Sequence, residues 1–288
     1  MDPVGAFFLG VLDGLTEGLI FALVAIGFTL SYGVLRIVNL THGEFYMIGA
    51  VMTWALYEAA KNTLYSLIIA PLFSAFLAII IERGVLSRIK YAPEPTIIAT
   101  AGLLYIIQQS TLMVIGPYSR SVPPPFSTVI STPWFGYSSY KIVIALASIM
   151  IAAILWIFLK RTNLGLHMRC VQQDAELAKS FGINVRKIYS LGFGLSAALA
   201  AAAGVLIVPI RQAHYLMGFD ALLMSLLAVT IGGMGSLRGT FLASLMIGLF
   251  GGIVAVFTSP TTSRILSIML VVLVVLFRPH GILERVKK

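Results

Sequence analysis

The stretch from Lys160 to Lys187, KRTNLGLHMRCVQQDAELAKSFGINVRK, decides how the rest of this sequence is read. It holds eight charged residues in 28 positions, whereas the segments on both sides of it are long and apolar. Inside it, the residues from Val171 to Phe181 have the pattern of a short amphipathic helix that ends at Gly182. A structured, charged segment in an otherwise lipid-compatible chain indicates a membrane protein that docks a partner on one face.

The composition predicts one polytopic membrane domain that covers residues 1–288. Of its 288 residues, 59% are hydrophobic and only 11% are charged, against about 25% charged in soluble domains. Spanning strands would need a closed barrel, and the sequence shows no alternating ten-residue pattern for one. We therefore expect an all-α transmembrane helical bundle. The single cysteine, Cys170, allows no disulfide framework, and no metal-ligand spacing of Cys and His occurs.

Nine segments are long and apolar enough to be considered as membrane spans, which need about 20 residues each. They are residues 5–30, 44–60, 64–82, 95–115, 140–160, 187–209, 220–237, 239–257 and 262–278. The stretches 31–44 and 231–240 are rich in Gly, Ser and Thr and are candidates for broken or re-entrant helices. The expected number of spans is therefore eight to ten.

Lysine and arginine predict the orientation, because cytoplasmic loops carry an excess of them. Fifteen of the 20 fall in one set of loops and five in the other. This bias places the loop 160–187 and the C-terminus in the cytoplasm and the N-terminus outside. The net charge of +9 is then a signal of topology, and no motif indicates nucleic acid. The proline- and aromatic-rich outer loop 116–139 either receives a soluble partner or forms an interfacial belt.

Four polar residues interrupt the apolar pattern near the second span: Asn39, Thr41, His42 and Glu44. The run Thr41-His42-Gly43-Glu44 fits a capping box, in which Thr41 caps the helix and Glu44 reaches back to an amide. The same residues also fit a broken helix that exposes its positive end to a transport pathway. Because an ionised Glu in lipid is unfavourable, we expect Glu44 at the cytoplasmic edge, inside the protein, or both.

A second break contains Gly232, Gly233 and Gly235, which permit tight turns. It is only superficially similar to a phosphate-binding loop, since no Gly-Lys pair occurs in the chain. The favoured interpretation is a hairpin turn between two packed spans, and we expect no ATP site, bound cofactor or enzymatic activity in this chain. Gln108 and Gln109, in the fourth predicted span, either line a pathway or form interhelical hydrogen bonds.

Four sequence motifs resemble one transporter family. Residues 35–50, LRIVNLTHGEFYMIGA, are similar to its N-x-x-H-G-E-x-x-M-x-G-A signature, and residues 174–184, DAELAKSFGIN, to its cytoplasmic A-x-L-x-G-[IV]-[ND] stretch. Residues 231–239, IGGMGSLRG, resemble its glycine-rich turn, although Arg238 stands where proline is common. Residues 277–283, FRPHGIL, resemble its closing motif. The family is that of permease subunits of branched-chain amino acid ABC importers, of the shorter of two types.

The resemblance implies a multi-pass protein of the prokaryotic inner membrane that works with several partners. These are a second permease subunit, two cytoplasmic ATPase subunits that use ATP and Mg²⁺, an extracytoplasmic substrate-binding protein and membrane lipid. A cytoplasmic coupling helix would dock the ATPase. In this sequence it would involve Val171, Asp174, Ala175, Glu176, Leu177, Ala178, Phe181 and Gly182. Its apolar face would be Val171, Ala175 and Ala178, with Leu177 and Phe181 alongside.

The expected substrates are branched-chain amino acids, namely leucine, isoleucine and valine. Importers of urea and short amides share these motifs and are the alternative. A self-sufficient secondary carrier would need ionisable residues in its spans, and the middle and later spans contain almost none. A purely structural subunit would have no need for the polar breaks.

Overall fold

The computed structural model describes residues 3–131 and 135–277 and contains a helix for each of the nine predicted segments. These are α1 (Pro3–Leu35), α2 (His42–Ala60), α3 (Ser66–Ile81), α4 (Pro93–Ile115), α5 (Ser139–Arg161), α8 (Val185–Ile207), α9 (Met217–Gly232), α10 (Leu237–Phe257) and α11 (Pro260–Phe277). A π-helical turn, η1 (Glu82–Leu86), extends α3. The motif at 278–283 lies outside the described residues, as does the C-terminus that we expect in the cytoplasm.

Within the described residues, six helices are long and apolar enough to cross a membrane: α1, α3 with η1, α4, α5, α8 and α10. Helices α9 and α11 are shorter apolar helices. Helix α2 has 19 residues and carries Glu44 and Glu58, which lower its mean hydropathy. The prediction of an all-α polytopic membrane protein is confirmed.

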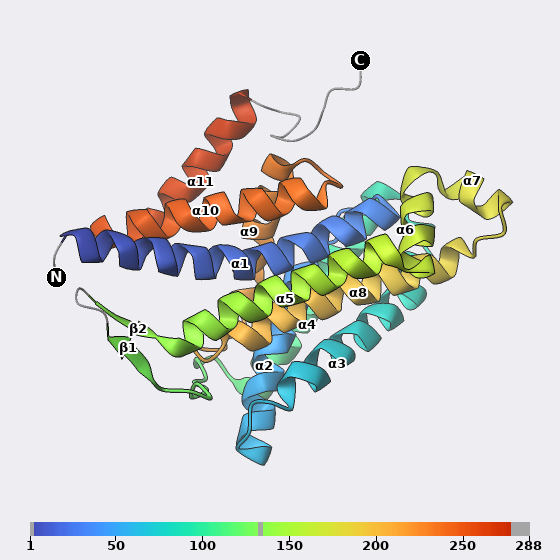
Figure 1. Ribbon diagram of the computed structural model, residues 1–288. Coiled ribbons are helices and arrows are strands. Elements are labelled where there is room, and N and C mark those ends of the chain that lie inside the picture. The colour runs from blue at the N-terminus through green and yellow to red at the C-terminus, as the bar shows by residue number, and fades with distance from the viewer. Residues whose placement is uncertain (1–2, 132–134, 278–288) are drawn as a thin grey trace.

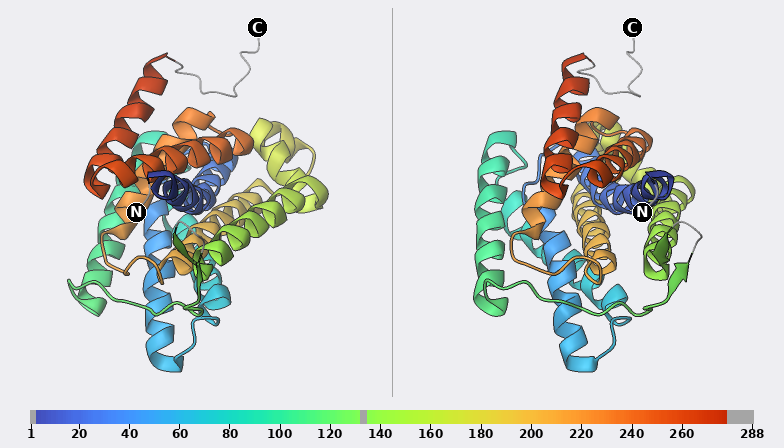
Figure 2. Two further views of the ribbon diagram at one scale, coloured as in Figure 1. Left: turned by 60° about the vertical axis from the view of Figure 1, so that its left-hand side comes forward. Right: turned by 90° about the vertical axis from the view of Figure 1, so that its left-hand side faces the viewer.

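Helices α1 and α8 form the interior of the bundle. In their most apolar stretches 89% and 78% of the residues are buried, against 17–28% in α3, α4, α5 and α10. A helix that is apolar on all sides can only be accommodated in lipid or in a protein core. Figures 1 and 2 show α1 enclosed by α10 on one side and by α5 and α8 on the other.

Glycines allow α1 and α10 to approach closely. A Cβ atom on Gly248 would lie 2.3 Å from the Cα of Gly18, and one on Gly252 would lie 2.4 Å from the Cα of Gly14. In lipid, helices gain little from hydrophobic association, so close contact between backbones supplies much of the packing energy. These glycines therefore hold α10 along the length of α1.

A small hairpin in the outer loop 116–139 joins that loop to α1. Its strands β1 (Val129–Ser131) and β2 (Gly136–Ser138) pair antiparallel, with Ile130 opposite Tyr137. The Tyr137 hydroxyl lies 3.0 Å from Thr16 Oγ1 and donates to the Leu12 carbonyl oxygen. The sequence did not predict this hairpin, because three-residue strands carry almost no periodicity.

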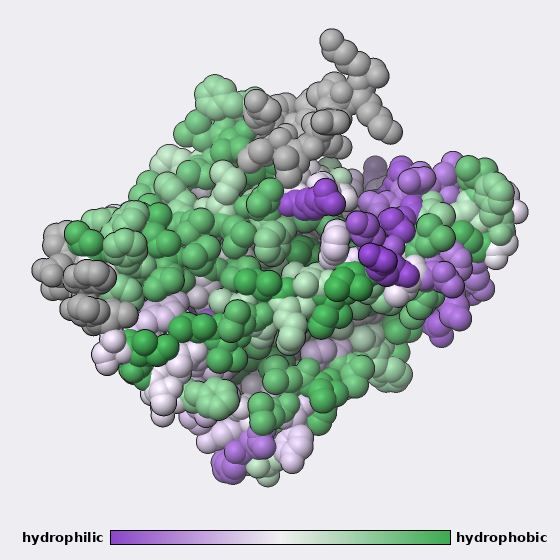
Figure 3. Space-filling model, in the orientation of Figure 1, coloured by the Kyte–Doolittle hydropathy of each residue, from purple (hydrophilic) through white to green (hydrophobic). Residues whose placement is uncertain are grey.

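The hydrophilic surface gathers at one end of the molecule (Figure 3). That end carries the two helices of the charged loop, α6 (Asn163–Gln173) and α7 (Ala175–Ser180), beside the last turn of α1. Most of the remaining surface in this view is apolar, as expected for a lipid-facing surface.

Replacing Gly248 by alanine should destabilise the protein. The new methyl group cannot fit against the α1 backbone, and overpacking of this kind typically costs about 1–3 kcal/mol. Thermal unfolding of the purified protein in detergent measures the effect. Gly102→Ala in α4 is the matched control, since no atom lies within 4 Å of its Cβ position. Equal melting temperatures for both variants would contradict the role of the α1–α10 contact.

Candidate functional site

The chain re-enters the bundle between α1 and α2, so that α2 begins near the middle of α1. The His42 Nε2 atom lies 2.9 Å from the carbonyl oxygen of Val24. Val24 lies 11 residues before Leu35, which is about 16 Å along the helix axis. Because the hydrocarbon core is about 30 Å thick, this is roughly half its depth. A break lies within the predicted stretch 31–44 and is shorter than that stretch, because only residues 36–41 lie between α1 and α2.

The re-entrant segment, residues 37–41, obtains its hydrogen bonds from within the protein. The Asn39 side-chain oxygen accepts a hydrogen bond from the Thr41 amide at 3.0 Å. In α4, the Thr100 hydroxyl accepts from the Leu40 amide at 3.3 Å, and the Thr100 carbonyl accepts from the Thr41 hydroxyl at 3.0 Å. Irregular backbone at membrane depth is tolerated only when it is buried and paired in this way.

The predicted capping box is wrong. Thr41 already has helical backbone angles (φ −70°, ψ −11°), so its hydroxyl donates to Thr100 instead of accepting from the first turn of α2. Its carbonyl oxygen accepts from the Glu44 amide at 3.0 Å. The Glu44 carboxyl group lies against Gly218 in α9.

Several polar atoms at this break are buried and have no hydrogen-bond partner among the described residues. They are Asn39 Nδ2, His42 Nδ1 and both carboxyl oxygens of Glu44. Each buried polar group left unpaired costs about 1–3 kcal/mol. Glu44 is fully buried, which confirms that it points into the protein. The cluster therefore has unpaired hydrogen-bonding atoms at the start of a broken helix. Transporters contact polar groups of their substrates at such positions.

The second glycine-rich break is the turn between α9 and α10, as the sequence favoured. Gly232 ends α9, and Gly233 and Gly235 have positive φ angles of 91° and 93°. A Cβ atom on Gly239 would lie 1.9 Å from the Gly232 carbonyl oxygen, so only glycine permits this close approach.

The two predicted glutamines of α4 have different surroundings and do not join the cluster at 39–44. Gln108 is buried, whereas Gln109 is exposed. A hydrogen bond between helices of this chain requires burial, and only Gln108 meets that requirement. The role of lining a pathway stays a prediction for both glutamines.

The charged loop contains two helices, not the single helix predicted from Val171 to Phe181. Asp174 separates α6 from α7, and its backbone is extended (φ −154°). Its Oδ1 atom accepts hydrogen bonds from the amides of Glu176 and Leu177, both at 2.9 Å. Aspartate is among the strongest N-cap residues, and here it starts a new helix where the apolar period would have continued. Gly182, with a φ angle of 82°, ends the element as predicted.

The apolar residues predicted for this element are only partly exposed. Val171 and Ala178 are almost fully buried in the core of this chain, and Ala175 packs against that core. The exposed apolar side chains are Leu177, at 56%, and Phe181, at 79%. Because the loop folds back onto its own bundle, the three small apolar residues anchor it, while Leu177 and Phe181 remain exposed.

The C-terminal end of α6 connects the two breaks. The guanidinium group of Arg36, just after α1, donates hydrogen bonds to the carbonyl oxygens of Gln172 and Gln173 at 3.0 and 3.2 Å. The Gln172 side chain donates to the Gly235 carbonyl oxygen at 3.4 Å. A cation at the last carbonyls of a helix is favourable. Sequence reasoning missed Arg36 and Gln172, since spacing along the chain gives no signal for this contact.

A cavity of about 810 Å³ opens at the other end of the bundle, between α1, α9, α10, α11 and the segment 208–216. Its lining includes charged residues of both signs: Asp13, Glu17, Arg211, Asp220 and Arg264. The sequence indicated no site here. Asp220 lies in the first turn of α9, where a negative charge is favourable. The four-residue spacing of Asp13 and Glu17 in an apolar span was the available signal.

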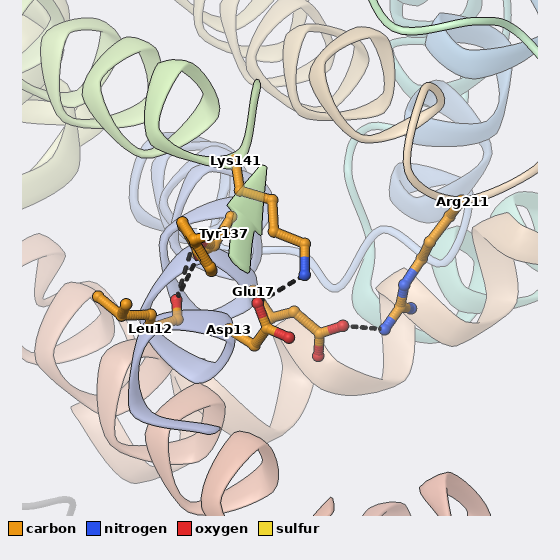
Figure 4. A network of polar contacts seen from close by, with 7 residues as sticks. Leu12, Asp13, Glu17, Tyr137, Lys141 and Arg211 are labelled. Carbon is orange, nitrogen blue, oxygen red and sulfur yellow. Dashed lines mark hydrogen bonds and ion pairs between the residues drawn. The ribbon is translucent and has the colours of Figure 1, made fainter. Parts of the chain in front are cut away.

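Three ion pairs involve carboxylates that line this cavity, and Figure 4 draws two of them. Lys141 of α5 lies 2.6 Å from Asp13, and Arg211 lies 2.5 Å from Glu17. The Arg264 Nη1 atom donates to Asp220 at 2.9 Å. These side chains are all between a quarter and a half exposed. Burial lowers the pKa of the nearby His214, which favours its neutral form.

The floor of the cavity is mainly apolar and lies next to the re-entrant break. Phe21, Tyr46, Met217 and Met224 line it. Gly218, the residue after Met217, contacts the Glu44 carboxyl group. The outer cavity and the buried polar cluster are therefore neighbours, with only the start of α9 and the first turns of α2 between them.

The comparisons with known proteins agree on one family. A family model described as "Branched-chain amino acid transport system / permease component" matches residues 10–275. The chain is 28% identical to the high-affinity branched-chain amino acid transport system permease protein LivH of Salmonella typhimurium, over 97% of this chain and 96% of that protein.

It is 29% identical to the corresponding permease protein BraD of Pseudomonas aeruginosa, over 99% and 98% of the two chains. A tyrosine transport system permease protein of Clostridioides difficile is 26% identical over 77% of this chain and 72% of its own length. No solved structure matches the chain. The chain belongs to the family of branched-chain amino acid transport system permease components.

Proposed function

We propose that this chain forms the translocation path for branched-chain amino acids in an ATP-driven importer. The names of the LivH and BraD relatives, which match nearly the whole chain, support this substrate class over urea and short amides. A second permease subunit completes the path, and an extracytoplasmic binding protein delivers the substrate. Two cytoplasmic ATPase subunits hydrolyse ATP with Mg²⁺, and the end of the bundle with α6 and α7 faces them.

The contact of α6 with both helix breaks supports this proposal most strongly. An ATPase that moves α6 and α7 pulls directly on Arg36, which precedes the re-entrant segment, and on Gly235, which lies in the α9–α10 turn. Both segments lead to the floor of the outer cavity. A rigid displacement at one end of the bundle is thus transmitted to the region where the cavity would have to open inward.

Leu177 and Phe181 are the proposed docking residues, and Asp174, Glu176 and Lys179 surround them with charge. Val171, Ala175, Ala178 and Gly182 give the element its shape and its anchorage. An exposed aromatic side chain within a polar rim is the usual arrangement of an interface anchor.

Phe181→Asp should weaken assembly with the ATPase subunits by about tenfold or more. Burial of a phenylalanine side chain is worth about 1.5–3 kcal/mol, and a charge at the centre of the contact removes it. Co-purification of the ATPase with the permease measures the loss. Phe126→Asp, at an exposed aromatic position of the outer loop, should leave assembly intact. Normal assembly of the Phe181 variant would place the docking surface elsewhere, and Glu176→Arg tests the polar rim in the same assay.

Arg36→Ala should uncouple ATP hydrolysis from uptake. The hydrogen bonds from a charged donor to α6 are worth about 1.5–3 kcal/mol, so their loss should lower uptake by about tenfold or more while ATPase activity persists. Proteoliposomes that contain the complete transporter allow both rates to be measured on one sample. Arg88→Ala, at an exposed arginine at the same end of the bundle, serves as the control. Parallel loss of both activities would indicate an assembly defect instead.

Glu44→Gln should preserve the fold and impair transport. Glutamine has the same shape but cannot be ionised or carry a transferable proton, and we expect uptake to fall by about tenfold, equivalent to ~1.4 kcal/mol on the barrier. The melting temperature and the uptake rate are compared with those of Glu58→Gln, at an exposed glutamate of the same helix. Unchanged uptake would reduce Glu44 to a hydrogen-bonding residue that glutamine can replace.

A further inference from the structure

The charges that surround the outer cavity are balanced. Its carboxylates are Asp13, Glu17 and Asp220, and the cations paired with them are Lys141, Arg211 and Arg264. Burial lowers the pKa of His214 and so favours its uncharged form. A ligand with a net charge would leave one of these groups without a counter-charge. The cavity therefore suits a ligand that is neutral overall and carries both signs.

The charged side chains of these ion pairs can exchange their present partners for the charged groups of a ligand. All six side chains retain a quarter to a half of their exposure, and pairs in contact with solvent are worth only about 0–1 kcal/mol. A ligand that replaces one carboxylate and one cation in these pairs therefore lowers the stability of the fold only slightly. Arg211 interacts electrostatically with Asp220 as well as with Glu17. The ion pairs of Arg211 and Arg264 therefore belong to one group of charges.

The deeper wall of the cavity is apolar and adaptable. Phe21 of α1, Met217 and Met224 of α9 and Ile247 of α10 meet there. Methionine side chains adjust to ligands of different shapes. The opposite wall contains Gly248, Gly251 and Gly252 of α10, which have no side chains and so leave space in the cavity. At about 810 Å³, the cavity falls within the usual range for small-molecule sites, about 300–1,000 Å³.

We propose that this cavity is a binding site for a zwitterionic amino acid with an apolar side chain. Arg211 and Arg264 bind the α-carboxylate, for which the guanidinium group offers paired donors. Glu17 and Asp220 bind the α-ammonium group, while the side chain rests against Met217, Met224 and Phe21. The inference rests on the proposed function and deepens it, because it assigns the residues that would receive the substrate on the outer side of the path.

The test is protection of a cysteine in the cavity, in the complete transporter reconstituted in nanodiscs. Ala255, an exposed residue of the lining, is changed to cysteine after Cys170, the one native thiol, is replaced by serine. A charged, water-soluble methanethiosulfonate reagent should label the new thiol. Saturating leucine should slow this labelling about tenfold. Leucinol, which lacks the carboxylate, and 4-methylpentanoate, which lacks the ammonium group, should have little effect.

A second substitution tests the recognition residues themselves. Arg264→Gln in the same background should raise the leucine concentration for half-protection by about tenfold or more. The labelling rate of each variant without leucine serves as its own reference. Lys61→Gln is the matched control, because Lys61 forms an exposed ion pair with Glu58 that lies outside the cavity. Glu17→Gln should act on leucine as Arg264→Gln does.

Three results would overturn the assignment: no labelling of the cysteine, labelling that leucine does not slow, or equal protection by leucine and leucinol. ATP-dependent leucine uptake is measured in parallel on the same transporter in proteoliposomes. Uptake without protection would refute the cavity as a binding site while the proposed function stands. Absence of uptake would refute the proposed function instead.

Discussion

This structure depends on one constraint: the polar backbone groups of a non-helical segment inside the membrane need hydrogen-bond partners. Helix α2 begins about halfway across the bundle, so the residues before it must cross the interior without helical hydrogen bonds. Asn39 and Thr100 provide those bonds, and α1, α4 and α9 enclose the segment. Without that enclosure the break would expose unpaired amides to lipid, at several kcal/mol for each group. The long α1 and the glycine contacts that hold α10 against it maintain the enclosure.

The functional regions follow one another along the bundle. The cavity with its balanced charges is at one end, the buried polar cluster around Glu44 lies beneath its floor, and α6 and α7 are at the other end. Neighbouring regions are connected by direct contacts: Gly218 touches Glu44, and Arg36 bonds to the end of α6. This continuity gives a physical route by which a partner on one face changes a site on the other.

The family motifs coincide with the irregular backbone along this route. The motif at 35–50 contains the break and the start of α2, and the motif at 231–239 contains the turn that Gln172 contacts. The motif at 174–184 contains α7, with Asp174 as its N-cap. By contrast, the ion pairs of the outer cavity lie outside all of these motifs. The irregular backbone and the ion pairs of the outer cavity therefore involve different residues.

The sequence by itself determined the helical membrane fold, the nine apolar segments, both breaks and the charged loop, because hydropathy and glycine content act locally. It did not determine the capping of α2, since Thr41 bonds to Thr100, which lies 59 residues away. It predicted one coupling helix where Asp174 starts a second, and it assigned Val171 and Ala178 to an outer face that the bundle covers. It also gave no indication that Glu17 meets Arg211, 194 residues apart. Only the tertiary structure decides such contacts, because an apolar periodicity shows that a side chain will be buried but not which helix will bury it.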